Sequence, residues 1–472
     1  MEEEKISKRQ LILVGIAVLL TGILLIVKPT YSVFQVNKTI NIMDAKVGDF
    51  GDKGFIKSFG GSDFDYFYGV TQTTDSGYAA VGQSYSTDGD LTGLNKGGSD
   101  AVIVKYDSGG NVLWNKNFGG SNPDCFMDVV ATTDGGYIAV GVSGSNDGDL
   151  VGLNKGGTDA IIVKYDSGGN VLWTKNFGGT SNEQFEAVKA TTDGGYIAVG
   201  TSLSTNGDLV GLNNGSSDAI IVKYDSNGIV QWKKNYGGSI ADCFSAVQVA
   251  FDGGYIAVGD SNSTDGDLAG LNKGRYDAII VKYDSNGIVQ WKRNYGGSGN
   301  AGVNTYDDYF YGVSLTSDGG YIGVGSSGST DGDLTGLNKG NNDGIIVKYD
   351  SGGGIVWKKN FGGSGQDYFA STVTTADGSH LIVGNSYSNN GNLTGLKKGI
   401  SADDAIIAKY DDAGNVIWNK NYGGSSGDNF NSVAPTADGF VAVGSSGSTD
   451  DDLTGLSKGG GPDAIIVKGK FN

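Results

Sequence analysis

Carboxylates recur at fixed positions along this sequence, and they are the residues best suited to bind a cation or a polar ligand. One set follows a Gly-Gly pair by a few residues, once in each of seven similar segments. The set comprises Asp65, Asp124, Glu183, Asp242, Asp308, Asp367 and Asp428. If these residues surround one axis, they form an acidic ligand-binding ring. The alternative is structural: each carboxylate accepts hydrogen bonds from its own Gly-Gly turn, as Asp does in Asx turns.

A second set of carboxylates lies in a long polar loop with the pattern Asp-Gly-Asp followed by a further Asp. Three copies of the pattern are Asp88, Asp90 and Asp100; Asp147, Asp149 and Asp159; and Asp265, Asp267 and Asp277. Closely spaced carboxylates and backbone carbonyls are the ligands that Ca²⁺ prefers. The loop lacks the alternating ligands and the bidentate Glu of an EF-hand. Calcium is therefore the one cofactor that the sequence suggests, and a turn-rich loop without an ion is the alternative.

The repeat is least regular where a seven-residue expansion runs from Ser298 to Tyr306. Tyr306, Asp307, Asp308 and Tyr309 follow one another there. Because an asymmetric ligand needs an asymmetric site, these four residues are candidate ligand contacts. A neutral loop insertion is the alternative.

Signatures of catalysis are scarce. The only histidine, His380, replaces the tyrosine of an Asp-Gly-Gly-Tyr turn in one copy, a position that favours packing. A histidine at a packing position does not favour a Ser-His-Asp triad or a Cys-His pair, and a single histidine cannot form a His-rich metal site. Carboxylate-pair chemistry, as in glycosidases, stays open. We assign no catalytic residue.

These candidate residues belong to a repeat that fills most of the chain. The Gly-Gly pairs begin at Gly60, Gly119, Gly178, Gly237, Gly296, Gly362 and Gly423, in steps of 59, 59, 59, 59, 66 and 61 residues. A fixed period of this length is typical of solenoids, propellers and repeat arrays. The chain therefore contains seven copies of one unit.

Each unit reads as four strands separated by turns. In the second copy we expect strands at 126–132, 137–141, 160–165 and 171–177, with a tight turn after the first and the third. Four antiparallel strands without a helix are the content of a propeller blade. The loop between the second and third strands and the loop to the next unit should emerge on one face, where loops that carry function are expected.

The two ends of the chain predict that the blades form a closed ring. The last copy stops after its third strand, at 463–468. The missing strand stands at the other end, at 55–59, where Phe55 occupies the place that Trp holds in the other six copies. We therefore predict an all-β fold, a seven-bladed β-propeller over residues 53–472. An open solenoid would need capping units, and none is visible.

An apolar run at 11–27 precedes the propeller, with basic residues before it. Its length is near the lower limit for a membrane-spanning helix and slightly long for a signal-peptide core. We expect a signal-anchor with residues 1–10 in the cytoplasm, a tether at 28–52 and the propeller outside the cell. If the segment is cleaved, the protein is secreted.

The net charge of −18 argues against nucleic acid as a partner, because nucleic acid demands a basic surface. An acidic exterior suits an extracellular domain. We expect a monomer whose contact with the membrane is made through the N-terminal segment.

The repeat motifs are Asp-Gly-Gly-Tyr-Ile-Ala-Val-Gly, Asp-Gly-Asp-Leu-x-Gly, Asp-Ala-Ile-Ile-Val-Lys-Tyr-Asp and Gly-Asn-Val-x-Trp. They resemble the β-propeller repeats of secreted and surface-anchored bacterial proteins. Residues 165–173 are also similar to the Trp-docking repeat of quinoprotein dehydrogenases and outer-membrane assembly propellers, with an Asp-to-Trp spacing one residue shorter. The resemblance implies a fold and a location, and no quinone or metal ligands accompany it.

The sequence thus favours a non-catalytic, cell-surface binding or adhesion scaffold that recognises a glycan or a protein through the long-loop face. The alternative is a polysaccharide hydrolase or lyase that uses carboxylates on the same face.

If the Asp-Gly-Asp loops bind calcium, millimolar calcium should raise the thermal unfolding midpoint of the protein, because a ligand that binds only the folded state stabilises it. Thermal unfolding followed during a calcium titration measures this effect. An unchanged midpoint would count against the calcium hypothesis.

Overall fold

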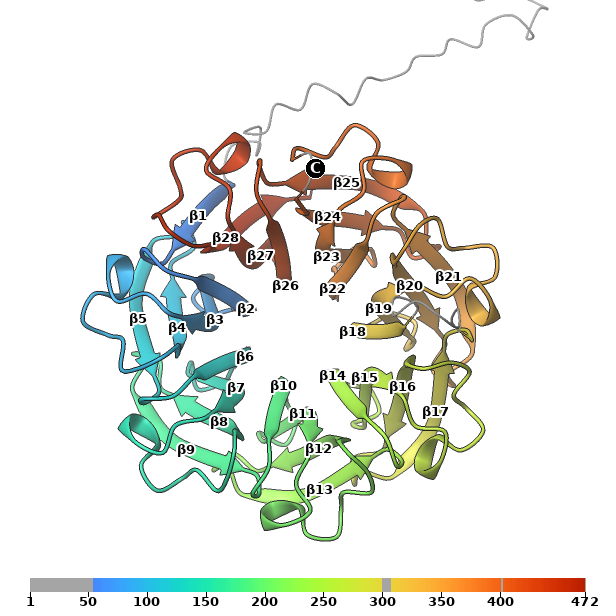
Figure 1. Ribbon diagram of the computed structural model, residues 1–472, viewed down its shortest axis with the longest axis horizontal. Coiled ribbons are helices and arrows are strands. Elements are labelled where there is room, and N and C mark those ends of the chain that lie inside the picture. Colours follow the sequence, from blue (N-terminus) through green and yellow to red (C-terminus); the bar gives the residue numbers. More distant parts are fainter. Residues whose placement is uncertain (1–53, 299–306, 400–401, 472) are drawn as a thin grey trace, which may run out of the picture. The chain divides into compact units, whose positions relative to one another are not determined.

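The computed structural model describes residues 54–298, 307–399 and 402–471. Within them the chain forms seven four-stranded antiparallel sheets arranged as blades around one axis (Figure 1). In six blades the strands follow one another from the axis outward in sequence order. The predicted seven-bladed β-propeller is confirmed.

Blade 1 sets the pattern for the others. Its strands are β2 (Asp65–Gln72), β3 (Tyr78–Ser84), β4 (Asp100–Tyr106) and β5 (Val112–Phe118). Blades 2 to 4 comprise β6 (Asp124–Ala131), β7 (Tyr137–Ser143), β8 (Asp159–Tyr165) and β9 (Val171–Phe177); β10 (Glu183–Ala190), β11 (Tyr196–Ser202), β12 (Asp218–Tyr224) and β13 (Val230–Tyr236); and β14 (Asp242–Val249), β15 (Tyr255–Ser261), β16 (Asp277–Tyr283) and β17 (Val289–Tyr295). Blades 5 and 6 comprise β18 (Asp308–Leu315), β19 (Tyr321–Ser327), β20 (Asp343–Tyr349) and β21 (Ile355–Phe361); and β22 (Asp367–Thr374), β23 (His380–Ser386), β24 (Asp404–Tyr410) and β25 (Val416–Tyr422).

Blade 7 joins the two ends of the described chain. It takes β26 (Asp428–Thr436), β27 (Gly439–Ser446) and β28 (Asp463–Lys470) from the C-terminal side and β1 (Phe55–Phe59) from the N-terminal side. The register of β1 against β28 runs from Phe55 opposite Lys468 to Phe59 opposite Ala464. The predicted closure of the ring by the N-terminal strand is confirmed.

Several predictions from the sequence concern residues outside the described part of the chain. They are the cytoplasmic segment 1–10, the membrane segment 11–27, the tether 28–52 and Tyr306 in the expanded loop. Over 54–298, 307–399 and 402–471, no helix is long and apolar enough to span a bilayer.

The two middle strands of each blade are buried on both sides. In blade 1, β4 has every residue buried, and β3 has all but one. Their continuous apolar runs fit this position, because a sheet covered on both faces shows no alternation of apolar and polar residues. The innermost strand β2 does alternate, with Phe67 fully buried while its neighbours Tyr66 and Tyr68 are half-buried.

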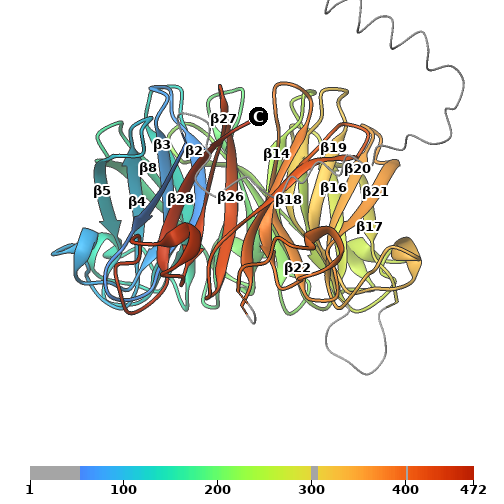
Figure 2. The same ribbon diagram turned by 90° about the horizontal axis from the view of Figure 1, so that it is seen from above.

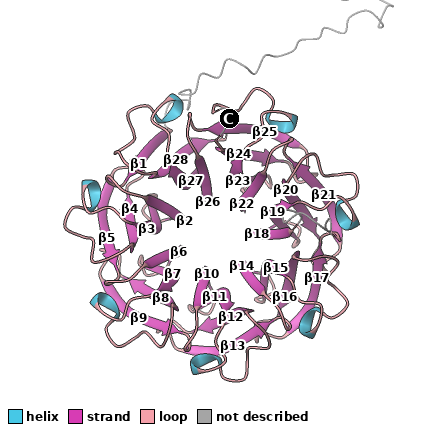
Figure 3. Ribbon diagram, in the orientation of Figure 1, coloured by secondary structure: helices cyan, strands magenta, loops and turns pink. Residues whose placement is uncertain are grey.

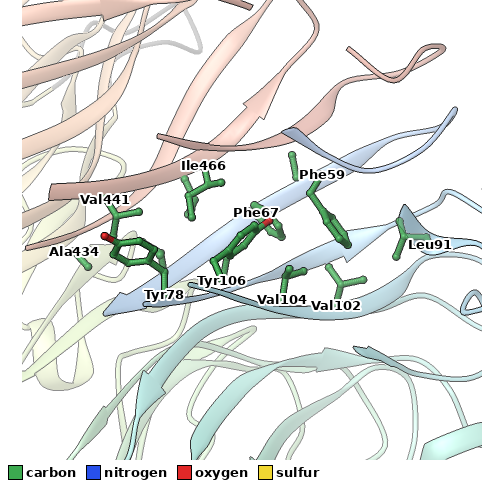
Figure 4. Packing of buried hydrophobic residues seen from close by; sticks show 14 residues of the cluster. Phe59, Phe67, Tyr78, Leu91, Val102, Val104, Tyr106, Ala434, Val441 and Ile466 are labelled. Carbon is green, nitrogen blue, oxygen red and sulfur yellow. The ribbon is translucent and has the colours of Figure 1, made fainter. Parts of the chain in front are cut away.

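The hydrophobic core is divided into seven clusters, each formed by two neighbouring blades. In one cluster, Phe67, Tyr78 and Tyr106 of blade 1 pack with Val441 and Ile466 of blade 7 (Figure 4). The other six clusters repeat this arrangement at the remaining junctions. No blade can therefore bury its apolar faces without both neighbours.

The tryptophans of the outermost strands contribute to the same junctions. Trp114 of β5 packs against Tyr137 of blade 2, with ring centroids 5.8 Å apart. Its indole N–H donates to the carbonyl of Ser167, 3.3 Å away. Trp114 therefore packs blade against blade.

The long loops of all blades lie at one end of the strands, and the tight turns lie at the other end (Figure 2). We call these ends the long-loop face and the short-turn face. Each long loop contains one 3₁₀ turn, which the sequence did not predict, and these turns lie on the outer rim of the ring (Figure 3). The turns are Gly89–Leu91, Gly148–Leu150, Gly207–Leu209, Gly266–Leu268, Gly332–Leu334, Gly391–Leu393 and Asp451–Leu453.

Each 3₁₀ turn attaches its loop to the preceding blade. In blade 1, Leu91 is buried in the core cluster shared with blade 7. The backbone N–H of Asp90 donates to the carbonyl of Gly60, 3.0 Å away. The long loops are therefore held in place by the blade junctions.

Closure by β1 predicts that Phe59→Ala destabilises the whole ring. Phe59 is buried at the junction of blades 7 and 1, with its ring 5.6 Å from that of Phe67. We expect a loss of about 3–5 kcal/mol in unfolding free energy, which is typical of Phe→Ala in a core. Chemical denaturation measures it. The control Leu113→Ala, an exposed residue of β5, should change it by less than about 0.5 kcal/mol. Equal effects of the two substitutions would contradict a stabilising role for closure.

Candidate functional site

The seven predicted ring carboxylates are buried at the blade junctions. In blade 1, Asp65 accepts the backbone N–H of Gly61 at 2.8 Å and the hydroxyls of Ser84 and Ser86. The Gly-Gly N–H contact recurs in all seven copies, at Asp65, Asp124, Glu183, Asp242, Asp308, Asp367 and Asp428. The hydrogen bonds of the structural alternative are thus present, and ligand binding by this ring stays a prediction.

A second buried carboxylate faces each ring carboxylate across the junction. Asp100 of blade 1 lies beside Asp124 of blade 2, and both contact Gly119: a Cβ built on this glycine would fall 2.5 Å from Asp124 Oδ2 and 2.6 Å from Asp100 Oδ1. Asp100 Oδ2 accepts the N–H of Lys96 and the amide of Asn117, while its Oδ1 has no hydrogen-bond partner within the described chain. The same oxygen is unpartnered in Asp159, Asp218, Asp277, Asp343, Asp404 and Asp463.

Burial of these paired acids raises their pKa values. Burial, and secondarily the neighbouring charge of Asp367, raise the pKa of Asp343 to about 6. Burial likewise raises the pKa of Asp428 and Asp463 to about 6 and that of Asp308 to about 7. Each junction therefore contains two acids, and ionisation of both is opposed by desolvation and mutual repulsion.

The predicted calcium residues point toward separate partners. Asp88 Oδ1 accepts the N–H of Ser62 at 2.7 Å. Asp90 Oδ2 accepts the N–H of Gly60 at 3.1 Å and the ammonium of Lys458 at 2.7 Å, and Asp100 lies in the buried pair described above.

The other two calcium triads repeat this arrangement. Asp147 and Asp265 accept the N–H groups of Ser121 and Ser239, and Asp149 and Asp267 accept those of Gly119 and Gly237. Asp159 and Asp277 lie in buried pairs. In the described part of the chain, no group of three or more His, Cys, Asp or Glu side chains is placed to hold a metal ion. Calcium binding stays a prediction.

Ion pairs across the blade junctions use the second acid of the Asp-Gly-Asp pattern. A lysine of one loop reaches the next loop, as in Lys96 with Asp149 at 2.5 Å and Lys155 with Asp208 at 2.5 Å. Blade 3 has Asn214 where the other described blades have lysine, so Asp267 of blade 4 lacks this partner. These loops therefore serve to connect blades on the long-loop face.

The central channel is lined by the innermost strand of every blade and contains a cavity of about 300 Å³. The residue after the core phenylalanine contributes to its wall in all seven copies. These residues are Tyr68, Met127, Glu186, Ser245, Tyr311, Ala370 and Asn431. No two neighbouring blades present the same residue, although the phenylalanine before it is invariant. The asymmetry of the repeat is thus concentrated on the channel wall, which our sequence analysis did not identify.

Stacked aromatic side chains follow the channel wall in two places. In blade 1, Phe64 stacks on Tyr66 at 6.4 Å between ring centroids, and Tyr66 stacks on Tyr68 at 6.1 Å. In blade 5, Tyr309 stacks on Tyr311 at 5.7 Å. Phe64 is 47% exposed, so the first stack begins at the surface of the long-loop face.

The structure brings together two of the four residues predicted at the expanded loop. The hydroxyl of Tyr309 donates to Asp307 Oδ2 at 3.0 Å. Asp308 points instead into the buried junction, where it accepts the N–H of Gly297. Asp307 therefore contacts Tyr309, which stacks on the channel residue Tyr311, and Asp308 belongs to the blade junction.

Two further acids that the sequence analysis missed lie in this region. Glu186 of β10 lines the cavity, and burial raises its pKa. Asp260 of β15 is half-buried, and burial raises its pKa to about 7, with additional contributions from the charges of Asp242, Glu186 and Asp307. At both positions the residue type differs among the seven copies, and this difference could have identified the two acids from the sequence.

The short-turn face carries one lysine–aspartate pair in each blade. Lys164 of β8 is buried and contacts Asp134 at 2.9 Å. The hydrogen bond from Thr132, together with that from Lys164, lowers the pKa of Asp134 to about 2. His380 is buried on the same face and contacts Asp412 at 3.3 Å, and burial lowers its pKa. These contacts support the turns, in agreement with a packing role for His380.

Comparisons with known proteins support the fold. Residues 99–276 match the family model described as outer membrane protein assembly factor BamB, which confirms the predicted resemblance to assembly-propeller repeats. The crystal structure of the RRP9 WD40 repeats is similar with a TM-score of 0.50 and 8% identity, over 88% of this chain and 97% of that one. BamB from Moraxella catarrhalis aligns with a TM-score of 0.37 and 13% identity, over 88% of this chain and 100% of that one.

A curated relative shares sequence over part of the chain. It is the regulatory protein FlaEY of Caulobacter vibrioides, 26% identical over 230 residues. The match covers 45% of this chain and 24% of the relative, so the chain spans about a quarter of the length of that relative. The comparisons together support the propeller fold.

Buried carboxylates with raised pKa values and exposed turn carboxylates with lowered pKa values together predict a stability maximum near pH 4 to 5. Asp343 and Asp463 have raised pKa values in the folded protein. The stability that they contribute is fully present below about pH 4, the pKa of Asp in the unfolded chain, and is lost as the pH rises through 6. Lowered values, as in Asp134 and Asp318, contribute stability that is lost as the pH falls from about 4 to 2. Thermal unfolding between pH 2 and 9 measures the loss of stability on both sides of the maximum.

Asp343→Asn serves as the matched variant for this prediction. The amide keeps the shape of the side chain and removes one charge of the pair with Asp367. Its unfolding midpoint should therefore exceed that of the unmodified protein at pH 8 and approach it at pH 5. A midpoint that rises from pH 5 to pH 8 in the unmodified protein would contradict the raised pKa values of the buried acid pairs.

Proposed function

We propose that this protein is a non-catalytic, cell-surface binding or adhesion scaffold that holds a glycan or a protein at the mouth of its channel on the long-loop face. The observation that carries the proposal is the distribution of variation among the seven copies. Residues that pack the blades are nearly identical from copy to copy, whereas channel-wall residues differ. Packing keeps the junction residues alike, whereas the channel wall is free of that constraint and can form a site for a ligand without sevenfold symmetry.

Exposed apolar side chains mark the mouth of the channel. Phe64 and Tyr85 of blade 1 are 47% and 40% exposed, and their rings meet edge to face at 6.4 Å. Tyr387 of blade 6 is 41% exposed at the position equivalent to Tyr85. Aromatic residues of this kind supply much of the binding free energy in recognition surfaces.

The proposed location at the cell surface derives from the N-terminal sequence. The apolar segment 11–27 and the tether would place the propeller outside the cell, where an acidic, glycine-rich surface is suitable. The ligand would then be a glycan or protein that is accessible from outside.

A hydrolase or lyase that acts on polysaccharide remains the second candidate, because one observation favours it. The pKa of Asp260, about 7, is suited to a general acid, and Glu186 is a second carboxyl at the same channel. With the same sugars, a scaffold predicts binding without cleavage, and an enzyme predicts cleavage.

The proposal is tested by glycan-array binding and by crosslinking to proteins on intact cells, using the full-length protein. The variant Phe64→Ser/Tyr85→Ser should reduce retention of any bound glycan or protein at least tenfold. The control Val112→Ser/Leu113→Ser removes two exposed apolar side chains from the short-turn face and should leave retention unchanged. Equal loss in both variants, or no retention by the unmodified protein, would refute the scaffold. Shortening of an arrayed polysaccharide, lost in Asp260→Asn, would favour the enzyme.

A further inference from the structure

A second cavity lies on the short-turn face, at the junction of the neighbouring blades 3 and 4 (Figure 1). It has a volume of about 590 Å³ and is lined by residues of the turns on this face and of the strands next to them. Small-molecule sites have volumes of about 300–1,000 Å³. The cavity is separate from the channel, because the two share no lining residue.

Two aromatic side chains belong to the lining of this cavity. Trp232 of β13 and Tyr255 of β15 have ring centroids 5.8 Å apart. The indole N–H of Trp232 donates to the carbonyl of Ser285, 3.3 Å away, and this bond fixes the ring. A ligand in the cavity therefore meets an aromatic surface of fixed orientation.

Two side-chain amides of the lining depart from the repeat. Gln231 of blade 3 stands where blades 1, 2, 5 and 6 have an aliphatic residue, namely Leu113, Leu172, Val356 and Ile417. Asn286 of blade 4 stands where the same blades have a small residue, namely Gly109, Gly168, Gly352 and Ala413. These amides meet at one cavity because one comes from each of the two blades.

Blades 3 and 4 each carry a second amide of this kind, but these two amides belong to other junctions. Asn227 precedes Gly228, which packs against Trp173 of blade 2. Gln290 precedes Trp291, which packs against Tyr321 of blade 5. The junction of blades 3 and 4 is therefore the one at which the sequence combines both amides.

The turn beside the cavity adds an aromatic side chain that the repeat lacks. Phe251 lies between the lining residues Val249 and Asp252, and it is 72% exposed. The equivalent residues are small or polar: Thr74, Thr133, Thr192, Ser317, Ala376 and Ala437. An exposed aromatic ring gains free energy when the apolar surface of a ligand covers it. Three departures from the repeat thus coincide at one junction.

The charges that line the cavity are already paired. Asp193 contacts the ammonium of Lys223 at 2.9 Å, and Asp252 contacts that of Lys282 at 2.8 Å. A charged ligand would lose hydration there without gaining an unpaired opposite charge among the lining residues. The cavity therefore favours a neutral ligand.

The two amides specify the polar groups of that ligand. Both side chains are exposed, and neither has a hydrogen-bond partner within the described chain. An amide both donates and accepts hydrogen bonds, and a hydroxyl group does the same. A sugar ring has hydroxyl groups around its edge and C–H groups on its faces, so it matches both the amides and the aromatic rings.

We propose that this cavity binds a neutral oligosaccharide, with Gln231 and Asn286 bonding to its hydroxyl groups and Phe251 packing against a sugar ring. The site goes beyond the function proposed above, because it lies on the face opposite the mouth of the channel on the long-loop face. The coincidence of the two amides and the exposed phenylalanine at one cavity carries the proposal.

The test is isothermal titration calorimetry of the full-length protein with five neutral trisaccharides: maltotriose, cellotriose, mannotriose, galactotriose and N-acetylchitotriose. Trigalacturonate is the anionic probe. Titration in solution detects a ligand that dissociates rapidly and that the washing of an array removes. At least one neutral trisaccharide should bind, and trigalacturonate should bind at least tenfold more weakly. No binding by any of the five, or equal binding of trigalacturonate, would overturn the proposal.

Matched double variants locate the binding. Gln231→Leu/Asn286→Gly introduces the residue types that blade 2 has at these positions, so the variant should fold, and it should weaken binding at least tenfold. The control Gln290→Leu/Asn227→Gly makes the same two substitutions in the same two blades at the neighbouring junctions and should change binding less than twofold. Phe251→Thr, which introduces the residue type of blades 1 to 3, should weaken binding at least threefold.

Equal effects of the two double variants, or an unchanged affinity in Phe251→Thr, would overturn the proposal. Loss of trisaccharide binding in Phe64→Ser/Tyr85→Ser, with normal binding in Gln231→Leu/Asn286→Gly, would place the sugar at the mouth of the channel. That result would overturn this site and support the scaffold function. Loss in Gln231→Leu/Asn286→Gly alone would support the site, whatever the outcome at the channel.

Discussion

The structure depends on one constraint: every blade buries its two faces only against its neighbours. The core consists of seven separate clusters at the blade junctions, so a blade without both neighbours would expose the apolar runs of its middle strands. The pairing of β1 with β28 supplies the seventh junction. Because the ring is closed, every blade is covered on both of its faces.

The same constraint explains why two groups of charged residues recur in every copy of the repeat. At each junction on the long-loop face, a ring carboxylate accepts the N–H of the Gly-Gly pair, and a second buried acid stands opposite. On the short-turn face, a buried lysine of the third strand contacts the aspartate of the first turn. Both arrangements are needed by every blade, which accounts for their presence in all seven copies. Invariance within this protein therefore marks structural residues.

Function, by contrast, is to be sought where the copies differ. The wall of the channel is a surface to which all blades contribute and on which their residues differ. Tyr68, Met127 and Glu186 occupy equivalent positions in three blades and have different chemistry. A repeat protein can thus build an asymmetric site from a symmetric scaffold by changing single residues of its innermost strands.

The sequence by itself determined the number of blades, the approximate strand positions and the closure of the ring. It could do so because the period, the turn residues and the complementary ends can all be read from the order of residues, and together they favour a closed ring of blades. The sequence also suggested that the ring carboxylates accept hydrogen bonds from their Gly-Gly turns.

Only the tertiary structure decided which residues face the channel and which acids meet. The innermost strands shift register after their phenylalanine, so simple alternation does not identify the residues beyond it. Glu186, Asp260 and Asp307 lie in three different blades, and their common environment exists only because the ring curves around one axis. Asp307 and Asp308 are adjacent in the chain, yet Asp307 accepts the hydroxyl of Tyr309 and Asp308 accepts the N–H of Gly297 in a blade junction. Their partners are brought to them by the fold, so the sequence alone does not distinguish the two residues.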